Sequence, residues 1–250
     1  VLVENIDLNE KTGVVCGVKS RKSFIARPPV ANVTNIVVLL SLVEPYFDFD
    51  QANRFLITAE KTNLEVSLVL TKSDLISKSK IKEYVKQIIN WGYEPFIISI
   101  KNEEGIDELI SKIETFKLAV LCGPSGVGKT SLINFLLPNK YLTTSSVSKK
   151  LKRGKHTTRN VELFALNDGC LIADTPGFNR PDLEIDPFQL AFLFPELRKQ
   201  IQNKETSCKF RNCLHRDEPG CSINKNWQRY SFYRECLDEM ITLHRQVQEG

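Results

Sequence analysis

The feature that most constrains this chain is a glycine-rich segment, Gly123-Pro124-Ser125-Gly126-Val127-Gly128-Lys129-Thr130-Ser131. It matches the pattern G-x-x-x-x-G-K-[ST], follows an apolar run at 118–122 and precedes a helical pattern that starts at Leu132. In this setting, backbone N–H groups and a helix N-terminus surround a polyphosphate. We expect Lys129 to reach the β- and γ-phosphates and Thr130 to offer its hydroxyl to Mg²⁺. The alternative is a simple glycine-rich turn, but the order strand, loop, helix favours a nucleotide site.

Strand and helix patterns alternate around this loop. Apolar runs predict buried strands at 35–42, 66–70, 95–100 and 118–122, and helical spacing predicts helices at 47–61, 80–91 and 106–116. Asn167-Asp168-Gly169 predicts the turn of a β-hairpin. The fold class is therefore expected to be α/β, a mainly parallel sheet with helices on both faces. Residues 1–28 alternate like strands around a turn at 9–13, which predicts part of a small β-barrel.

Composition sets broad limits on the class of protein. The chain has 250 residues, of which 42% are hydrophobic and 26% charged, and this balance excludes a disordered or collagen-like chain. No apolar stretch is long enough to span a bilayer, so we expect a soluble protein. The first residues, Val1–Glu4, have no initiator Met and no signal-peptide pattern, and we expect the chain to begin inside a domain.

A basic segment follows the phosphate-binding loop. Residues 149–159 contain six Lys or Arg and no acid, which suits contact with the phosphates of a nucleotide or a nucleic acid. A solvated basic loop is the alternative.

A second motif, Thr71-Lys72-Ser73-Asp74, ends the strand predicted at 66–70. It resembles the [NT]-K-x-D element of GTPases, in which the carboxylate accepts hydrogen bonds from two guanine donors and the Lys stem packs over the base. Its place at the carboxyl end of a strand is where open α/β sheets bind ligands. The motif therefore favours GTP over ATP and argues against a P-loop ATPase or kinase.

A third motif, Asp174-Thr175-Pro176-Gly177, fits the D-x-x-G element, whose Asp holds Mg²⁺ and whose Gly senses the γ-phosphate. In the common GTPase order the phosphate-binding loop comes first and the base-reading element last. Here Asp74 precedes the loop and Asp174 follows it, so the domain is circularly permuted. With this order the sequence closely resembles the ribosome small subunit-dependent GTPase A family, and the resemblance covers nearly the whole chain.

The resemblance implies further site residues. Residues 27–33 look like the family's junction between an OB-type barrel and the GTPase domain, and Ser99 lies where a second base-contacting loop is expected. The segment 153–158 resembles the family's R-G-x-H-T-T switch, in which either Thr157 or Thr158 would bind Mg²⁺. By the same resemblance His156 would position the attacking water or assist proton transfer. A phosphate or RNA contact is the alternative role for this His.

Phe178 stands where Ras-like GTPases carry the Gln that orients water. Because a benzyl group cannot orient water, we expect slow hydrolysis by the protein alone.

A group of soft metal ligands lies near the C-terminus: Cys208, Cys213, His215 and Cys221. Three thiolates and one imidazole suit a closed, tetrahedral, structural Zn²⁺ site, and their spacing also matches the resembled family. Unrelated buried cysteines beside a surface His are the alternative. Cys236 falls on an apolar helical stripe, and Cys16, Cys122 and Cys170 lie in strand patterns, so we expect these four to pack in the core.

These observations combine into one expectation. Residues 1–30 form a partial OB-fold barrel, 31–195 a circularly permuted GTPase domain and 196–250 an α-helical zinc-binding module. The protein is a cytoplasmic monomer that binds GTP and GDP with Mg²⁺, holds one structural Zn²⁺ and hydrolyses GTP during late assembly of the small (30S) ribosomal subunit. That subunit and its rRNA stimulate hydrolysis, with Lys129 and His156 as catalytic residues. The alternatives are an RNA-binding zinc protein with a vestigial nucleotide site, or a P-loop ATPase.

Overall fold

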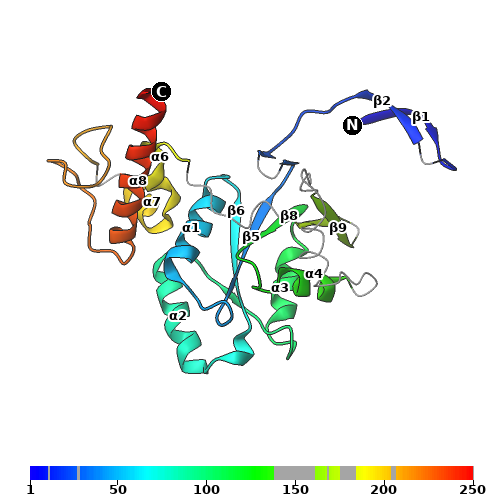
Figure 1. The fold of residues 1–250 in the computed structure, drawn as a ribbon, viewed down its shortest axis with the longest axis horizontal. Coiled ribbons are helices and arrows are strands. Elements are labelled where there is room, and N and C mark those ends of the chain that lie inside the picture. The colour runs from blue at the N-terminus through cyan, green and yellow to red at the C-terminus, as the bar shows by residue number, and fades with distance from the viewer. Residues whose placement is uncertain are drawn as a thin grey trace.

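A six-stranded sheet forms the centre of the chain (Figure 1). The structure is a computed structural model that describes residues 1–10, 12–26, 29–137, 161–167, 169–174, 184–203 and 207–249. In spatial order the strands are β7 (Phe96–Ile97), β6 (Glu65–Thr71), β5 (Asn35–Ser41), β8 (Leu118–Cys122), β10 (Cys170–Asp174) and β9 (Glu162–Asn167). The first five are parallel, and β9 pairs with β10 in the antiparallel direction. The expected α/β class and the expected hairpin, which β9 and β10 form, are therefore confirmed.

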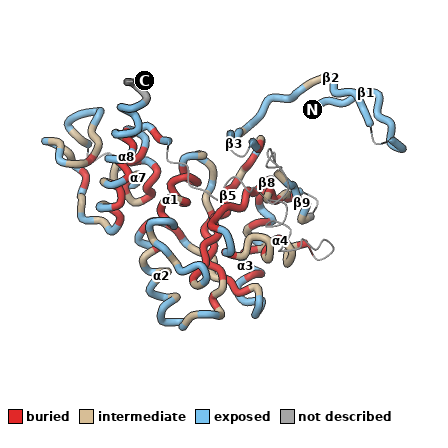
Figure 2. Tube along the Cα trace, viewed as in Figure 1, coloured by how far each residue is buried: buried red, intermediate tan, exposed pale blue. Residues whose placement is uncertain are grey.

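The central strand β5 is buried over its whole length, and its side chains alternate between two cores. Val38 and Leu40 face the core formed with α1 (Phe49–Glu60) and α2 (Lys78–Asn90). Val37 and Leu39 face the core formed with α3 (Ile106–Ile113) and α4 (Lys129–Leu136). Since successive residues of a strand point to opposite faces, a continuous apolar run is what a strand covered by helices on both sides requires (Figure 2).

The boundaries of these elements agree with the sequence patterns except at two places. The helix expected at 106–116 ends at Ile113, and the strand expected at 95–100 pairs only over Phe96–Ile97. Beyond that pair, Ser99 forms an isolated bridge with Glu104. A 3-10 helix, η1 (Ser73–Leu75), follows β6 directly.

The N-terminal residues form two small sheets outside the central one. β1 (Leu2–Asp7) and β2 (Thr12–Gly17) make an antiparallel hairpin, and β3 (Phe24–Ile25) pairs with β4 (Val30–Ala31). The hairpin lies apart from the central sheet, and its side chains are exposed (Figures 1 and 2). Cys16 is exposed with them, so its expected core position is wrong; Cys122, Cys170 and Cys236 are buried as expected.

The C-terminal module, here residues 184–249, packs beside α1 (Figure 1). It contains α6 (Pro187–Leu190), the 3-10 helix η4 (Ala191–Leu193), α7 (Pro195–Gln202) and α8 (Tyr230–Glu249). A third core joins these helices, and Ile57 of α1 belongs to it. None of the helices in the described ranges is long and apolar enough to cross a membrane.

Candidate active site and metal centre

The phosphate-binding loop connects β8 to α4, as the motif predicts. Gly123 has φ 141°, and a Cβ atom there would lie 2.1 Å from the carbonyl oxygen of Leu39, so only glycine fits. Gly128 has φ 99° and forms the N-cap of α4. The loop therefore brings its backbone close to the central strand and then opens a helix N-terminus, which is the geometry that binds phosphate.

Lys129 points back across the loop. Its ammonium donates hydrogen bonds to the carbonyl oxygens of Gly123 and Pro124 at 2.7 and 2.8 Å. Burial lowers the pKa of this ammonium, and the nearby Asp174 carboxylate opposes that shift. The side chain thus places a partly desolvated cation over the loop, where it strengthens interactions with an anion.

Three sequence motifs lie at the same edge of the sheet, because the strands that lead into them are parallel and end there. β6 leads into Thr71–Asp74, β8 leads into the loop, and Asp174 ends β10. Asp174 pairs in register with Leu121, one residue before the end of β8, and its charge acts on Lys129. The carboxyl edge of a parallel sheet is where α/β proteins bind ligands. The fold therefore brings together the residues that the sequence motifs single out separately.

Asp74 is oriented by Ser99, which follows β7. The Ser99 hydroxyl donates to Asp74 Oδ1 at 2.7 Å and accepts from the backbone N–H of Asn102 at 3.1 Å. The backbone N–H of Ser73 also donates to the Ile98 carbonyl oxygen at 3.2 Å. The two segments expected to contact the base are thus held to each other.

Thr71 has a supporting position. Its side chain is buried, and its hydroxyl donates to the carbonyl oxygen of Val127 in the phosphate-binding loop at 2.7 Å. The hydroxyl also lies 3.4 Å from the Leu40 carbonyl oxygen. Thr71 therefore links the base-reading strand to the phosphate-binding loop through a side chain.

Sequence reasoning missed the segment 43–48, which follows β5. Lys72, in the left-handed region at φ 60°, donates from its ammonium to the Glu44 carbonyl oxygen. A Cβ atom on Gly126 would lie 3.7 Å from Pro45 Cδ, so this proline sits against the phosphate-binding loop. The Glu-Pro dipeptide indicates a turn, but its sequence carries no sign of which loops it contacts.

Several predicted site residues lie outside the described residues. These are His156, Thr157, Thr158, Gly177 and Phe178, together with the basic segment 149–159. Their roles remain predictions from the sequence.

The four predicted metal ligands come together in the C-terminal module. The ligand atoms of Cys208, Cys213, His215 and Cys221 all lie within 4.8 Å of one another. His215 Nδ1 is 3.6 Å from Cys208 Sγ and 3.8 Å from Cys221 Sγ. Tetrahedral Zn²⁺, with bonds of about 2.3 Å to sulfur and about 2.0 Å to nitrogen, requires a sulfur–nitrogen separation of ~3.6 Å. The cluster therefore has the donor set and spacing to bind a metal ion.

Neighbouring groups hold the metal-binding loop in shape. Glu218 accepts hydrogen bonds from the backbone N–H groups of Leu214 and Arg216 at 2.9 and 2.7 Å. From α8, the hydroxyl of Tyr233 donates to the Leu214 carbonyl oxygen at 2.7 Å. The loop is thus fixed to the helix that anchors the module, so the ligands are positioned by protein contacts as well.

Comparisons with known proteins agree with this geometry. The family model for the RsgA GTPase matches residues 18–184. Two similar curated proteins are both called Small ribosomal subunit biogenesis GTPase RsgA. The one from Prochlorococcus marinus (strain NATL1A) is 56% identical over 99% of this chain and 79% of its own length. The one from Synechococcus sp. (strain CC9605) is 51% identical over 100% of this chain and 82% of its own length.

Solved structures show the same arrangement. YjeQ from Thermotoga maritima superposes with a TM-score of 0.74 at 25% identity, over 96% of this chain and 82% of that one. YloQ, described as a circularly permuted GTPase, superposes with a TM-score of 0.70 at 31% identity, over 94% of this chain and 78% of that one. The motif order, the sheet and these relatives agree, and the chain belongs to the RsgA GTPase family, with a circularly permuted GTPase domain.

Proposed function

We propose that this protein binds the small ribosomal subunit and hydrolyses GTP during the subunit's late assembly. The observation that carries the proposal is the meeting of Asp74, Lys129 and Asp174 at the carboxyl edge of one parallel sheet. The names of the relatives, which describe small ribosomal subunit biogenesis, supply the partner. The protein would act in the cytoplasm as a monomer.

Each nucleotide contact has a proposed residue. Asp74, oriented by Ser99, would accept both hydrogen bonds from guanine, and the stem of Lys72 would cover the base. Lys129 and the backbone of 123–131 would hold the phosphates. Adenine does not offer the same pair of donors, so the arrangement favours GTP over ATP.

Magnesium and the catalytic switch complete the proposed site. Thr130, Asp174 and either Thr157 or Thr158 would hold the Mg²⁺ that accompanies GTP, and Gly177 would sense the γ-phosphate. The metal ion would offset charge on the transferred phosphoryl group. His156 would position the attacking water, since Phe178 cannot. Contact of the subunit with the basic segment would hold His156 near the γ-phosphate and so accelerate hydrolysis.

The C-terminal cluster is proposed to hold one structural Zn²⁺. Four protein ligands leave no open position for a substrate, which argues against catalysis at this metal. We propose three parts: a partial OB-type barrel at 1–30, the GTPase domain at 31–195, and the zinc module at 196–250. The segment 184–195, the last part of the proposed GTPase domain, packs with the zinc module, because Ile185, Leu190 and Phe194 share a core with α8, and for this reason the C-terminal module as defined by packing begins at residue 184.

The test is turnover of GTP by purified protein alone, with small ribosomal subunits and with large ones. We expect slow turnover alone and stimulation by small subunits only. The Lys129→Ala variant is assayed in parallel as a control. Because this variant should not hydrolyse GTP, any turnover measured with it comes from GTPases that contaminate the subunit preparation. No stimulation by small subunits, or equal stimulation by large ones, would overturn the proposal.

A further inference from the structure

Helix α1 has two sets of neighbours that belong to different parts of the protein. Its N-terminal end follows the segment 43–48, which touches the nucleotide motifs, and Asp48 caps the helix by accepting from the backbone N–H groups of Asp50 and Gln51 at 2.9 and 3.1 Å. One side of the same helix packs against the C-terminal module. A rigid helix therefore connects the nucleotide site to the module.

The segment 43–48 is packed closely against the phosphate-binding loop. Pro45, Tyr46, Pro124 and Val127 line a crevice of about 10 Å³, which has room for about one water molecule at most. The Glu44 carbonyl oxygen accepts from the ammonium of Lys72. A displacement of this segment would therefore move both the base-covering lysine and the loop that holds the phosphates.

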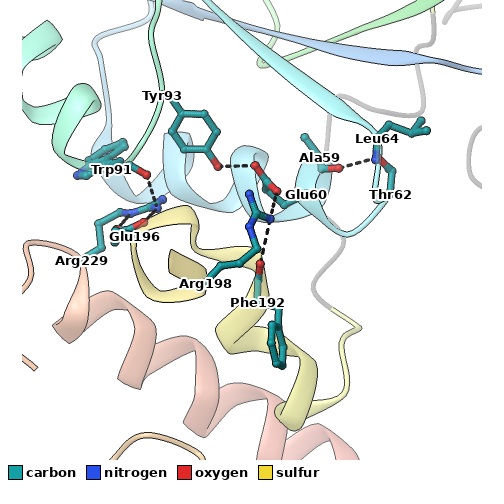
Figure 3. Close-up of polar contacts among 10 residues, drawn as sticks. All are labelled: Ala59, Glu60, Thr62, Leu64, Trp91, Tyr93, Phe192, Glu196, Arg198 and Arg229. Atoms are coloured by element: carbon teal, nitrogen blue, oxygen red, sulfur yellow. Dashed lines mark hydrogen bonds and ion pairs between the residues drawn. The ribbon is translucent and has the colours of Figure 1, made fainter. Parts of the chain in front are cut away.

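On the other side, Arg229 anchors the module to α1, and Figure 3 shows its contacts with Glu196 and Trp91. Its guanidinium is buried and pairs through two nitrogens with Glu196 of α7. It also donates to Asn53 Oδ1 of α1 at 3.2 Å and to the Trp91 carbonyl oxygen at 3.4 Å. The planar guanidinium lies 5.0 Å from the Trp91 ring and 4.8 Å from the Phe194 ring. One side chain thus holds elements from both parts of the protein.

A second contact lies further along α1, at the largely buried side chain of Glu60 (Figure 3). Glu60 accepts from Arg198 of α7 at 2.8 Å and from the hydroxyl of Tyr93 at 3.1 Å. Ile57 lies in the module's core, one turn after Asn53. Positions 53, 57 and 60 repeat at helical spacing, so one face of α1 is fixed to the module along most of its length.

Aromatic rings connect Arg229 back to the segment 43–48. The ring of Trp91 lies 5.6 Å from that of Phe49, and Phe49 lies 5.0 Å from Phe47. Phe47 and Phe49 also contact Tyr84 of α2, at 5.0 and 5.8 Å. These rings form a continuous packed path from Trp91, against which the Arg229 guanidinium lies, to Phe47.

We propose that the C-terminal module supports the nucleotide site, with Arg229 as a positioning residue that sets helix α1 and, through it, the segment 43–48. This goes beyond the proposed function, since it concerns how tightly the protein binds nucleotide when no ribosomal subunit is present. Coupling of this kind is reciprocal. Weakening the contact at Arg229 must lower nucleotide affinity, and binding of nucleotide must alter the surroundings of Trp91.

The chain contains two tryptophans, Trp91 and Trp227, which allows a direct measurement. Trp227→Phe leaves Trp91 as the only tryptophan. Trp91 follows the C-terminal end of α2, whose 13 residues span about 20 Å, and the base-reading motif precedes the N-terminal end of that helix. The Trp91 ring is buried against Phe49 and Arg229, so we expect GDP to act on it through these neighbours. We expect GDP to change Trp91 emission and its quenching by acrylamide, with half-saturation at the Kd of GDP. Unchanged emission and quenching at saturating GDP would overturn the proposal.

Variants at Arg229 test the reverse direction. Arg229→Lys keeps the positive charge but loses the planar guanidinium that donates to Glu196 through two nitrogens. The double variant Glu196→Gln/Arg229→Met removes both charges together, so that neither charge is left buried without its partner. We expect GDP to bind about fivefold more weakly or worse in the double variant, with a smaller loss in Arg229→Lys and metal content unchanged in both.

The matched control is Arg234→Met, since the Arg234 side chain on α8 is 43% exposed and pairs with Asp217 within the module. It should bind GDP like the wild type. Wild-type affinity in a folded Arg229 variant would contradict the proposal. If neither Arg229 variant folds, the Trp91 measurement decides the question by itself.

Discussion

Replacing Thr71 by Val tests the link between the base-reading strand and the phosphate-binding loop. The two side chains have nearly the same shape, so the substitution removes a hydroxyl and leaves no large cavity. Thr71 is 1% exposed and Val127 is fully buried. Without the hydroxyl, the Val127 carbonyl oxygen loses its 2.7 Å hydrogen bond in a place that water cannot easily reach.

The expected loss in the free energy of unfolding follows from the burial of this carbonyl oxygen. A buried acceptor left without a partner costs about 1–3 kcal/mol, which is roughly a 5- to 150-fold shift in the folding equilibrium. Since the same carbonyl belongs to the phosphate-binding loop, GDP affinity should also fall several-fold.

The assay is urea unfolding without nucleotide, because bound nucleotide would add its own stabilisation, followed by a separate GDP titration. Thr242→Val is the matched control: its hydroxyl donates to the Asp238 carbonyl oxygen at 2.8 Å on an exposed face of α8. That change should cost less than about 0.5 kcal/mol. If Thr71→Val has the wild-type free energy of unfolding and the wild-type GDP affinity, the supporting role is refuted.

Two further predictions concern the base and the metal. Asp74→Asn should change the preference from GTP to xanthosine triphosphate, because an amide donates where the carboxylate accepted; competition binding measures this, and unchanged GTP preference would remove the guanine-reading role. Cys213→Ser should lower metal content from the one zinc expected per chain, because a hydroxyl is a poorer ligand for Zn²⁺ than a thiolate. Elemental analysis of protein purified without chelator measures this, and a wild-type protein without zinc would contradict the site.

Local sequence determined much of this protein. The segment 123–131 specifies a turn that only glycine can make at Gly123, and it does so with residues next to each other in the chain. The apolar runs specify strands covered on both faces, and parallel strands must end at one edge, so the meeting of Asp74, Lys129 and Asp174 could be predicted. Three cysteines and a histidine lie within fourteen residues of each other, and this spacing alone predicted that their side chains would come together as a metal site.

Other features depended on contacts between residues far apart in the chain. Thr71 belongs to a base-reading motif by pattern, but its hydroxyl supports the carbonyl oxygen of Val127 in the phosphate-binding loop, 56 residues away. Arg229 reads in sequence as one more basic residue before a helix. It became a buried anchor only because α7, α8 and α1 pack together and place it 3.2 Å from Asn53, 176 residues earlier. Motifs and periodicity predict the local structure of a segment and which of its faces is buried. The partner of a buried polar group depends on how helices and strands pack against one another, and only the tertiary structure decides that.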